Sequence, residues 1–175
     1  MRESGHGGGR APHEEGMAEG ERGKMTYAYR LLSDSDVPLL LQLLQVFGEA
    51  FDEPQTYQGA VPSSQYLQAL LARRHFMVLV ALEQSGTVVG GLAAYELEKF
   101  ERERSEIYIY DLAVAEPHRR RGIARGLINQ LKGIARDRGA YVIFVQADRG
   151  DEPAIRLYES LGAREHVYHF DIPVD

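Results

Sequence analysis

Three consecutive arginines stand immediately before a glycine that opens a helix-like pattern of apolar residues. The first N–H groups of a helix have no hydrogen-bond partner within it, and the helix dipole adds partial positive charge at that end. Such an end binds anions, and a glycine there lets a phosphate approach the backbone closely. The segment therefore predicts a phosphate-binding turn, and a solvated charged turn is the alternative. The residues that would hold the anion are Arg119, Arg120, Arg121, Gly122, Ile123 and Ala124.

A single carboxylate, Asp111, interrupts the otherwise uncharged stretch of residues 107–115, just ahead of the arginine turn. A carboxylate in a buried strand needs a partner, because its charge loses the solvation that water provides. Asp111 is therefore a candidate functional residue, whose charge needs a partner. Its neighbour Tyr110 is a second candidate for the same pocket. Strand alternation would place the two side chains on opposite faces unless a bulge intervenes.

The elements that must position these residues alternate between strand-like and helix-like patterns, as in a mixed α/β fold. Strands are predicted at residues 26–32, 76–83, 87–97, 105–114, 141–147 and 166–172. Helices are predicted after the cap residues 33–36, from residue 63 or 64, and at 122–139 and 151–161, with a loop at 52–59. The run at 141–147 is strongly apolar, so a buried strand is expected there. The Gly90-Gly91 pair predicts a close backbone approach or a bulge.

Composition bounds the organisation and the class of protein. Residues 1–24 include seven glycines and four apolar residues, so we expect a disordered tail, followed by one domain at 25–175. The chain has no cysteine, which excludes disulfides, thiolate metal sites and an acyl-cysteine intermediate. Its histidines have no convincing metal spacing, so no metal is expected.

A net charge of -6 argues against a general nucleic-acid binder, and no run is long enough to span a membrane. We expect a cytoplasmic protein, because the N-terminus lacks the apolar core of a signal peptide.

The spacing Arg119-x-x-Gly122-x-Ala124 resembles the pyrophosphate-binding signature of the GNAT superfamily of acetyltransferases. This resemblance implies the GNAT fold, a mixed central sheet flanked by helices, with acetyl-CoA as cosubstrate. It implies that the strand ending Leu112-Ala113-Val114 bulges and pairs with the pantetheine arm. Asp151, Ala154 and Tyr158 match a second motif of the family, although asparagine is usual where Asp151 stands. The resemblance gives Tyr158 the role of protonating the departing thiolate or hydrogen-bonding to it. By spacing alone, the residue would instead be read as a core aromatic.

Longer stretches resemble aminoglycoside 3-N-acetyltransferases of the gentamicin-modifying type, over about residues 27–172. Among them are residues 92–95, 99–101, 105–114, 139–143, 145–148 and 169–172. The resemblance implies an aminoglycoside as acceptor, antibiotic resistance, and dimerisation as in many relatives. Since no cysteine exists to hold the acetyl group, we expect both substrates to bind together, with Asp111 holding the attacking ammonium group or taking a proton from it directly or through water. An acidic cleft would suit a polycation, with candidates Tyr110, Asp111, Asp52, Asp148 and Glu152. Two alternatives stay open: another amine, such as a polyamine, a peptide N-terminus or a lysine, and a non-catalytic acetyl-CoA-binding module.

Overall fold

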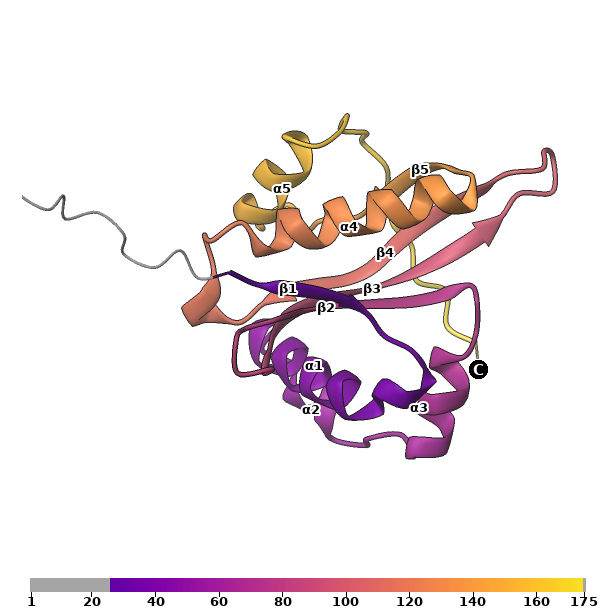
Figure 1. Ribbon diagram of the computed structural model, residues 1–175. Helices are drawn as coiled ribbons and strands as arrows, with labels where there is room; N and C mark the ends of the chain where they lie inside the picture. Colours follow the sequence, from indigo (N-terminus) through magenta and orange to yellow (C-terminus); the bar gives the residue numbers. More distant parts are fainter. Residues whose placement is uncertain (1–25, 175) are drawn as a thin grey trace, which may run out of the picture.

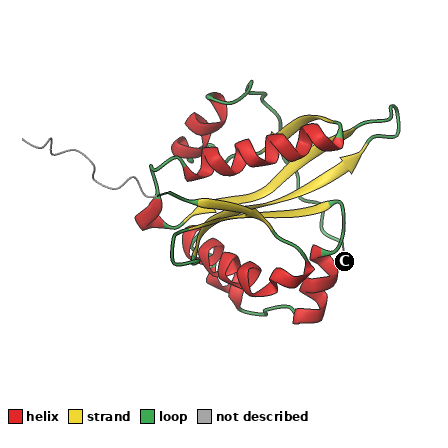
Figure 2. Cartoon of the chain, in the orientation of Figure 1, coloured by secondary structure: helices red, strands yellow, loops and turns green. Residues whose placement is uncertain are grey.

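The computed structural model describes residues 26–174, which form a five-stranded sheet with helices on both faces. Figures 1 and 2 show α4 and α5 covering one face and α1, α2 and α3 covering the other. The strands follow one another across the sheet in chain order, from β1 to β5. The first four are antiparallel, and β5 runs parallel to β4. The mixed sheet flanked by helices that the sequence predicts is thus confirmed.

The elements have the following bounds. The strands are β1 Ala28–Leu31, β2 Phe76–Leu82, β3 Val88–Glu98, β4 Ser105–Val114 and β5 Ala140–Val145. The helices are α1 Val37–Ala50, α2 Pro54–Gln58, α3 Ser64–Leu71, α4 Ile123–Arg138 and α5 Glu152–Glu159, with short 3-10 turns at Asp34–Asp36 and Glu116–His118.

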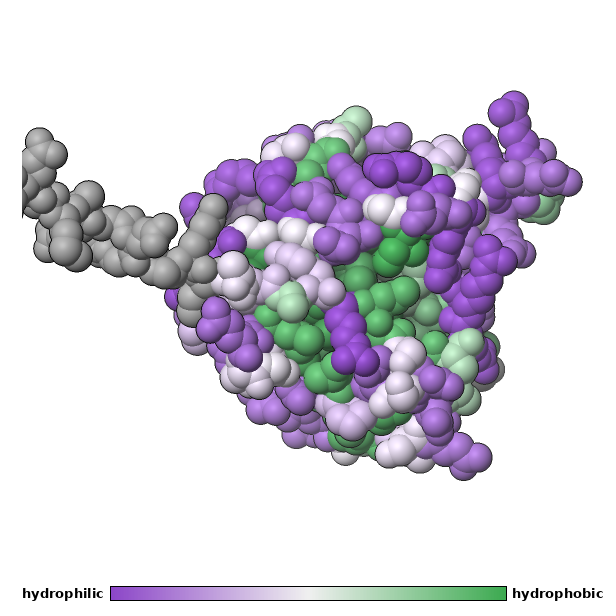
Figure 3. All heavy atoms as spheres, in the orientation of Figure 1, coloured by the Kyte–Doolittle hydropathy of each residue, from purple (hydrophilic) through white to green (hydrophobic). Residues whose placement is uncertain are grey.

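Each face of the sheet has its own apolar core. Leu127 and Leu131 of α4 are fully buried on one face, and Leu43 and Phe47 of α1 are buried on the other. Between the two helix layers, Figure 3 shows apolar side chains gathered over β1 and β2, at the first edge of the sheet. This two-sided burial explains why β2 reads as a continuous apolar run, since helices cover both of its faces.

The glycine pair of β3 makes the predicted close approach. A Cβ added at Gly91 would lie 2.6 Å from Leu43 Cδ1 and 2.6 Å from the Leu79 carbonyl oxygen. Helix α1 therefore lies closer to the sheet than a side chain at this position would allow. The register of β2 and β3 also shifts between Ala81 and Leu82, opposite the same part of β3.

Three sequence-based expectations differ from the structure. Residues 54–58 form helix α2 rather than part of a loop. Strand β5 was expected to be buried, but it lies at a sheet edge, and Tyr141, Val142 and Phe144 are all exposed. The strand expected at residues 166–172 is absent, and this stretch has no regular structure although apolar side chains such as Phe170 recur along it. The tail predicted at residues 1–24 lies outside the described residues.

Two features are absent from the described part of the chain. Between residues 26 and 174, no helix combines the length and the apolar character that a bilayer crossing requires. Within the same residues, no group of three or more histidine, aspartate or glutamate side chains is arranged to hold a metal ion.

Candidate active site

Strand β4 bulges where the sequence places its candidate chemistry. Ala93 of β3 pairs with Asp111, whereas the next residue, Ala94, pairs with Ile109, so Tyr110 is the extra residue. The bulge resets the alternation of side chains, because one residue is inserted without a partner. Tyr110 contacts Tyr108 on the same strand and Tyr95 on β3, with ring centroids 5.9 and 6.0 Å apart. The bulge thus removes the conflict between Tyr110 and Asp111 that regular alternation would create.

The pairing of β4 with β5 ends at this same point. The last pair joins Ile109 to Val145, and β4 continues through residues 110–114 beyond the end of β5. On that side, among the described residues, the N–H and C=O groups of 110–114 have no neighbouring strand. Unpaired strand edges of this kind accept an extended ligand through backbone hydrogen bonds. Leu112, Ala113 and Val114, which the resemblance assigns to the pantetheine arm, lie along this edge.

The arginine turn leads into α4 through a left-handed glycine. Gly122 has φ +80°, and a Cβ added there would meet no heavy atom within 4 Å. The first hydrogen bond of the helix runs from the Gly126 N–H to the Gly122 carbonyl. The N–H groups of Ile123 and Ala124 precede that bond and are free of intrahelical partners. The Ile123 side chain is buried in the core, so this residue would contribute its backbone only.

The three arginines are exposed and have different surroundings. Arg119 donates from Nε to the Val114 carbonyl at 3.0 Å, which ties the turn to the end of β4. Arg121 donates from Nη1 to the Tyr27 hydroxyl at 3.4 Å. Arg120 takes a left-handed backbone conformation with φ +63°. The three arginines therefore precede the open end of α4 in an exposed turn, and the Arg119 hydrogen bond ties that turn to β4.

Asp111 is partly buried on the α1 side of the sheet, where α2 supplies its partner. The Tyr57 hydroxyl donates to Asp111 Oδ1 at 3.1 Å. Burial raises the pKa of Asp111, the Tyr57 hydrogen bond lowers it, and the nearby Glu53 carboxylate raises it. A carboxylate with a raised pKa is a better proton acceptor than an ordinary surface aspartate. The sequence analysis missed Tyr57, because it predicted a loop where α2 forms.

Tyr158 lies on α5, among side chains that pack against the α4 core. Burial, and secondarily the nearby Asp151, raises the pKa of Tyr158 to about 12, so its hydroxyl stays protonated at neutral pH. Asp151 caps α5 by accepting the Ala154 N–H at 3.1 Å. Asp151 thereby has a structural role that its sequence position did not reveal.

The remaining acidic candidates are separate from Asp111. Asp52 lies in an exposed turn after α1 with φ 55°, and its neighbour Glu53 is the residue whose charge acts on Asp111. Glu152 is exposed and pairs with Arg156 at 3.6 Å, and Asp148 lies in the exposed loop before α5. These carboxylates can add negative charge around the site, but the structure gives them no contact with Asp111.

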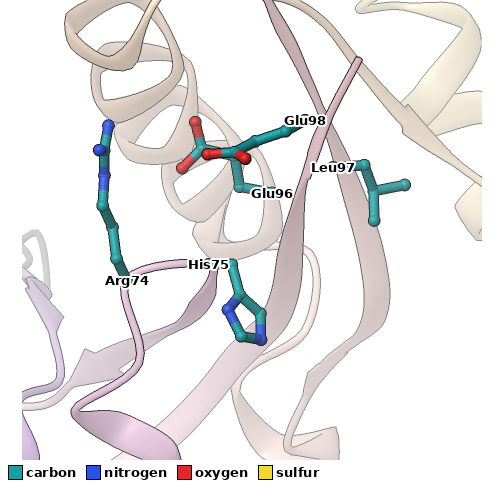
Figure 4. A pocket seen from close by; sticks show the side chains of 5 residues that line it. All are labelled: Arg74, His75, Glu96, Leu97 and Glu98. Carbon is teal, nitrogen blue, oxygen red and sulfur yellow. The ribbon is translucent and has the colours of Figure 1, made fainter. Parts of the chain in front are cut away.

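A hollow of about 400 Å³ lies at the other end of the β3–β4 pair, lined by Arg74, His75, Glu96, Leu97 and Glu98. Figure 4 shows the Glu96 and Glu98 carboxylates turned to one side of the strand and Leu97 to the other. Glu96 accepts from Ser105 Oγ at 2.8 Å and from Arg138 Nη1 at 2.9 Å, one bond on each oxygen. Both oxygens are therefore occupied, and the carboxylate acts as a tie between the sheet and α4.

Comparisons with known proteins agree with this geometry. The chain is 58% identical to an aminoglycoside acetyltransferase from an uncultured soil metagenomic sample, with 86% of this chain and 100% of that chain covered and a TM-score of 0.84. A second soil aminoglycoside acetyltransferase, solved in complex with sisomicin, is 34% identical, with 85% and 97% covered and a TM-score of 0.79.

A curated relative, N-acetyltransferase family 8 member 2 of Rattus norvegicus, is 30% identical over 88 residues, which are 50% of this chain. The matched stretch spans only 39% of that relative's length. The family model for the acetyltransferase (GNAT) family matches residues 40–163, a stretch that includes β4, the arginine turn and Tyr158. This match covers well over half of the chain, and the chain therefore belongs to the acetyltransferase (GNAT) family, whose enzymes use acetyl-CoA as cosubstrate.

Proposed function

We propose that this protein transfers an acetyl group from acetyl-CoA to an amine of an aminoglycoside, with both substrates bound at once. The observation that carries the proposal is the separation of β4 from β5 after Ile109. This separation leaves an open strand edge between Asp111 and the helix start at Gly122. Identity of 58% to a soil aminoglycoside acetyltransferase, over that protein's whole length, supports the aminoglycoside as acceptor.

The residues fit acetyl-CoA, which supplies an activated acetyl thioester. The pyrophosphate would lie against the N–H groups of Ile123 and Ala124, since the space over Gly122 is empty and three exposed arginines precede it in the chain. The pantetheine arm would pair with residues 112–114. The backbone N–H groups there would also polarise the thioester carbonyl and stabilise the negative charge that develops on its oxygen.

Asp111 is the base in this proposal. It accepts a proton from the ammonium group of the acceptor, directly or through one water, and so frees the amine lone pair for attack on the thioester. Tyr110 lies beside it, and the side chain of Tyr110 is 63% exposed, so it can contact the acceptor. Asp52, Asp148 and Glu152 contribute negative charge at longer range, which favours a polycation over a neutral amine.

Tyr158 serves the leaving group. Its raised pKa keeps the proton on the hydroxyl at neutral pH, so the group can donate to the departing thiolate of coenzyme A. The chain has no cysteine, so the acetyl group passes directly from the thioester to the amine.

The test is a thiol-release assay with acetyl-CoA and four acceptors: gentamicin, sisomicin, kanamycin and spermidine. The proposal expects turnover on gentamicin and sisomicin with spermidine weak, and NMR of the product should locate the acetyl group on the 3-amino nitrogen. Turnover on spermidine alone would replace the acceptor by a polyamine. Binding of acetyl-CoA without turnover on any amine would favour a non-catalytic binding module.

Two further expectations belong to this function. Expression in a susceptible bacterial host should raise the minimum inhibitory concentration of gentamicin, and it should not do so for the Asp111→Asn variant. The protein should also form a homodimer, because the open edge of β5 and the exposed apolar residues of 167–174 are surfaces that proteins usually cover. Sedimentation velocity distinguishes dimer from monomer, and a monomer at all concentrations would contradict this expectation.

A further inference from the structure

Helix α2 is short but firmly attached to α1. The Glu53 N–H donates to the Gly48 carbonyl at 3.0 Å, and a Cβ added at Gly48 would lie 2.6 Å from Gln58 Nε2. The Tyr57 ring contacts the rings of Phe47 and Phe51, each at a centroid distance of 5.7 Å. The two phenylalanine rings thus fix the direction of the Tyr57 side chain, and the phenol has little rotational freedom to lose when it makes a hydrogen bond.

The hydroxyl of this fixed ring meets Asp111, which is 54 residues away in the sequence. Within residues 26–174, the Asp111 side chain accepts one hydrogen bond, from the Tyr57 hydroxyl, and no arginine, lysine or histidine of this part of the chain forms an ion pair with Asp111. A neutral donor orients a carboxylate without cancelling its charge, whereas an arginine would neutralise it. Oδ1 is held by Tyr57, and Oδ2 remains for an incoming ammonium group.

We propose that Tyr57 is a positioning residue of the acceptor site, which holds one oxygen of Asp111 so that the other accepts the proton of the attacking amine. This inference rests on the proposed function, because it takes Asp111 as the base. It assigns α2, outside the acetyl-CoA turn and the β4 bulge, to the catalytic apparatus.

The electrostatics give the proposal a measurable consequence. Burial raises the pKa of Asp111, and the Tyr57 hydrogen bond opposes that rise. Burial and the Asp111 charge raise the pKa of Tyr57 itself, so the phenol remains a donor at every pH at which the enzyme would work. Of the other titratable groups nearby, Glu53 at the start of α2 acts on both members of the pair and Tyr110 of β4 acts on Tyr57. The Asp111 charge in turn contributes to the raised pKa of Tyr95 on β3 and of Tyr108 on β4.

The experiment is the pH profile of kcat/KM for Tyr57→Phe, a change that deletes one oxygen and keeps the ring. Without the hydrogen bond the pKa of Asp111 rises further, so a larger fraction of the base is protonated at the acidic end. We expect the acidic limb to move to higher pH, with kcat/KM about tenfold lower there, the usual worth of a hydrogen bond to a charged group. The loss should shrink at alkaline pH and appear in kcat more than in KM.

Tyr141→Phe is the matched control. Tyr141 also donates its hydroxyl to a carboxylate, that of Glu106, at the beginning of β4 and far from the bulge. The same atom is deleted from the same kind of bond, and no change in the acidic limb is expected. In the Asp111→Asn background, Tyr57→Phe should cause no further shift.

A direct titration keeps this test independent of turnover. In protein labelled with 13C at aspartate carboxyl carbons, the Asp111 signal is assigned by its loss in Asp111→Asn, and its titration should move to higher pH in Tyr57→Phe. An unchanged Asp111 titration, or a lower melting temperature with an unchanged titration and pH profile, would overturn the proposal and leave Tyr57 as a packing residue. If the wild type acetylates no aminoglycoside while the titration moves as expected, the proposed function fails and the Tyr57–Asp111 link stands.

Discussion

Strands β3 and β4 carry two shielded carboxylates, one at the bulge and one toward the end of β3, and the two are held in opposite ways. Glu96 of β3, which lies opposite the beginning of β4, accepts hydrogen bonds from the Ser105 hydroxyl and the Arg138 guanidinium, so both of its oxygens and its charge are satisfied. At the bulge, Asp111 receives one neutral phenol from Tyr57.

The difference separates a structural carboxylate from a reactive one. A buried charge that is fully paired with a cation contributes to the integrity of the fold and has nothing left to bind. Asp111 retains an unmatched negative charge and a raised pKa in a partly buried position. Perturbed groups of this kind gather at functional sites, and here the perturbed group lies where β4 leaves β5.

The largest expected effect comes from removing the reactive carboxylate. Asp111→Asn keeps the carbonyl oxygen that accepts from Tyr57 but cannot take a proton, so kcat/KM on gentamicin should fall by about 10²- to 10⁴-fold. Glu96→Gln is the comparison variant, and each folded molecule of it should turn over gentamicin at the wild-type rate. Thiol release at saturating acetyl-CoA measures both. Equal losses in the two variants would erase the distinction between the two carboxylates.

Removing the structural carboxylate of Glu96 should change the free energy of unfolding rather than the activity. Glu96→Gln leaves Arg138 without its counter-ion, and we expect a loss of about 3 kcal/mol in the free energy of unfolding. The estimate is at the lower end for a buried pair, since Arg138 keeps 20% of its side chain exposed. Arg164→Met is the control: the Arg164–Glu159 pair has the same 2.9 Å separation but is about half exposed, so its loss should cost less than about 1 kcal/mol. Urea unfolding measures both, and similar losses would show that burial does not decide the outcome.

The two carboxylates also mark what the sequence could and could not predict. Local signals were sufficient for α4, whose apolar spacing and flanking glycines are confirmed, and for singling out Asp111 as the one charge in residues 107–115. The roles of Tyr57 and Arg138 could not be predicted, because each side chain meets its carboxylate across more than 40 residues of sequence. Helix α2 could not be predicted for a related reason. Five residues are too few to show helical periodicity, and contacts with Phe47 and Phe51 hold them in place.

Strand β5 and the C-terminal stretch show a different limit. An apolar run predicts a strand but cannot say whether the strand lies inside a sheet or at its edge, and β5 lies at the edge. Alternating side chains at 166–172 are typical of a strand, yet a strand needs a neighbour, and this stretch has none among the described residues.

The cosubstrate side of the site can be tested with the two ends of α4. Gly122 and Gly139 have φ +80° and +76°, and a Cβ at either would meet no heavy atom within 4 Å. Alanine at either position should cost about 1 kcal/mol of stability, because both are left-handed. Only Gly122→Ala places a methyl group where the pyrophosphate should approach, so we expect its KM for acetyl-CoA to rise about tenfold, equivalent to about 1.4 kcal/mol. Equal KM values in the two variants would place the pyrophosphate elsewhere.

The smallest expected effect is on stability at pH 7, which the two carboxylate substitutions should change in opposite directions. Burial raises the pKa of Asp111 in the folded protein above its value in the unfolded chain. Below the unfolded pKa the carboxyl is protonated in both states and costs nothing. As pH rises through the folded pKa, the folded state must hold a buried charge, and stability is lost. Asp111→Asn should therefore be slightly more stable than the wild type at pH 7, and the gain should vanish at pH 3. Glu96→Gln should be less stable than the wild type at pH 7. Thermal melts of both variants at the two pH values measure this opposite change in stability.

A destabilised Asp111→Asn protein at pH 7 would mean that the bulge needs this charge for its fold, and the stability evidence for a reactive carboxylate would be lost.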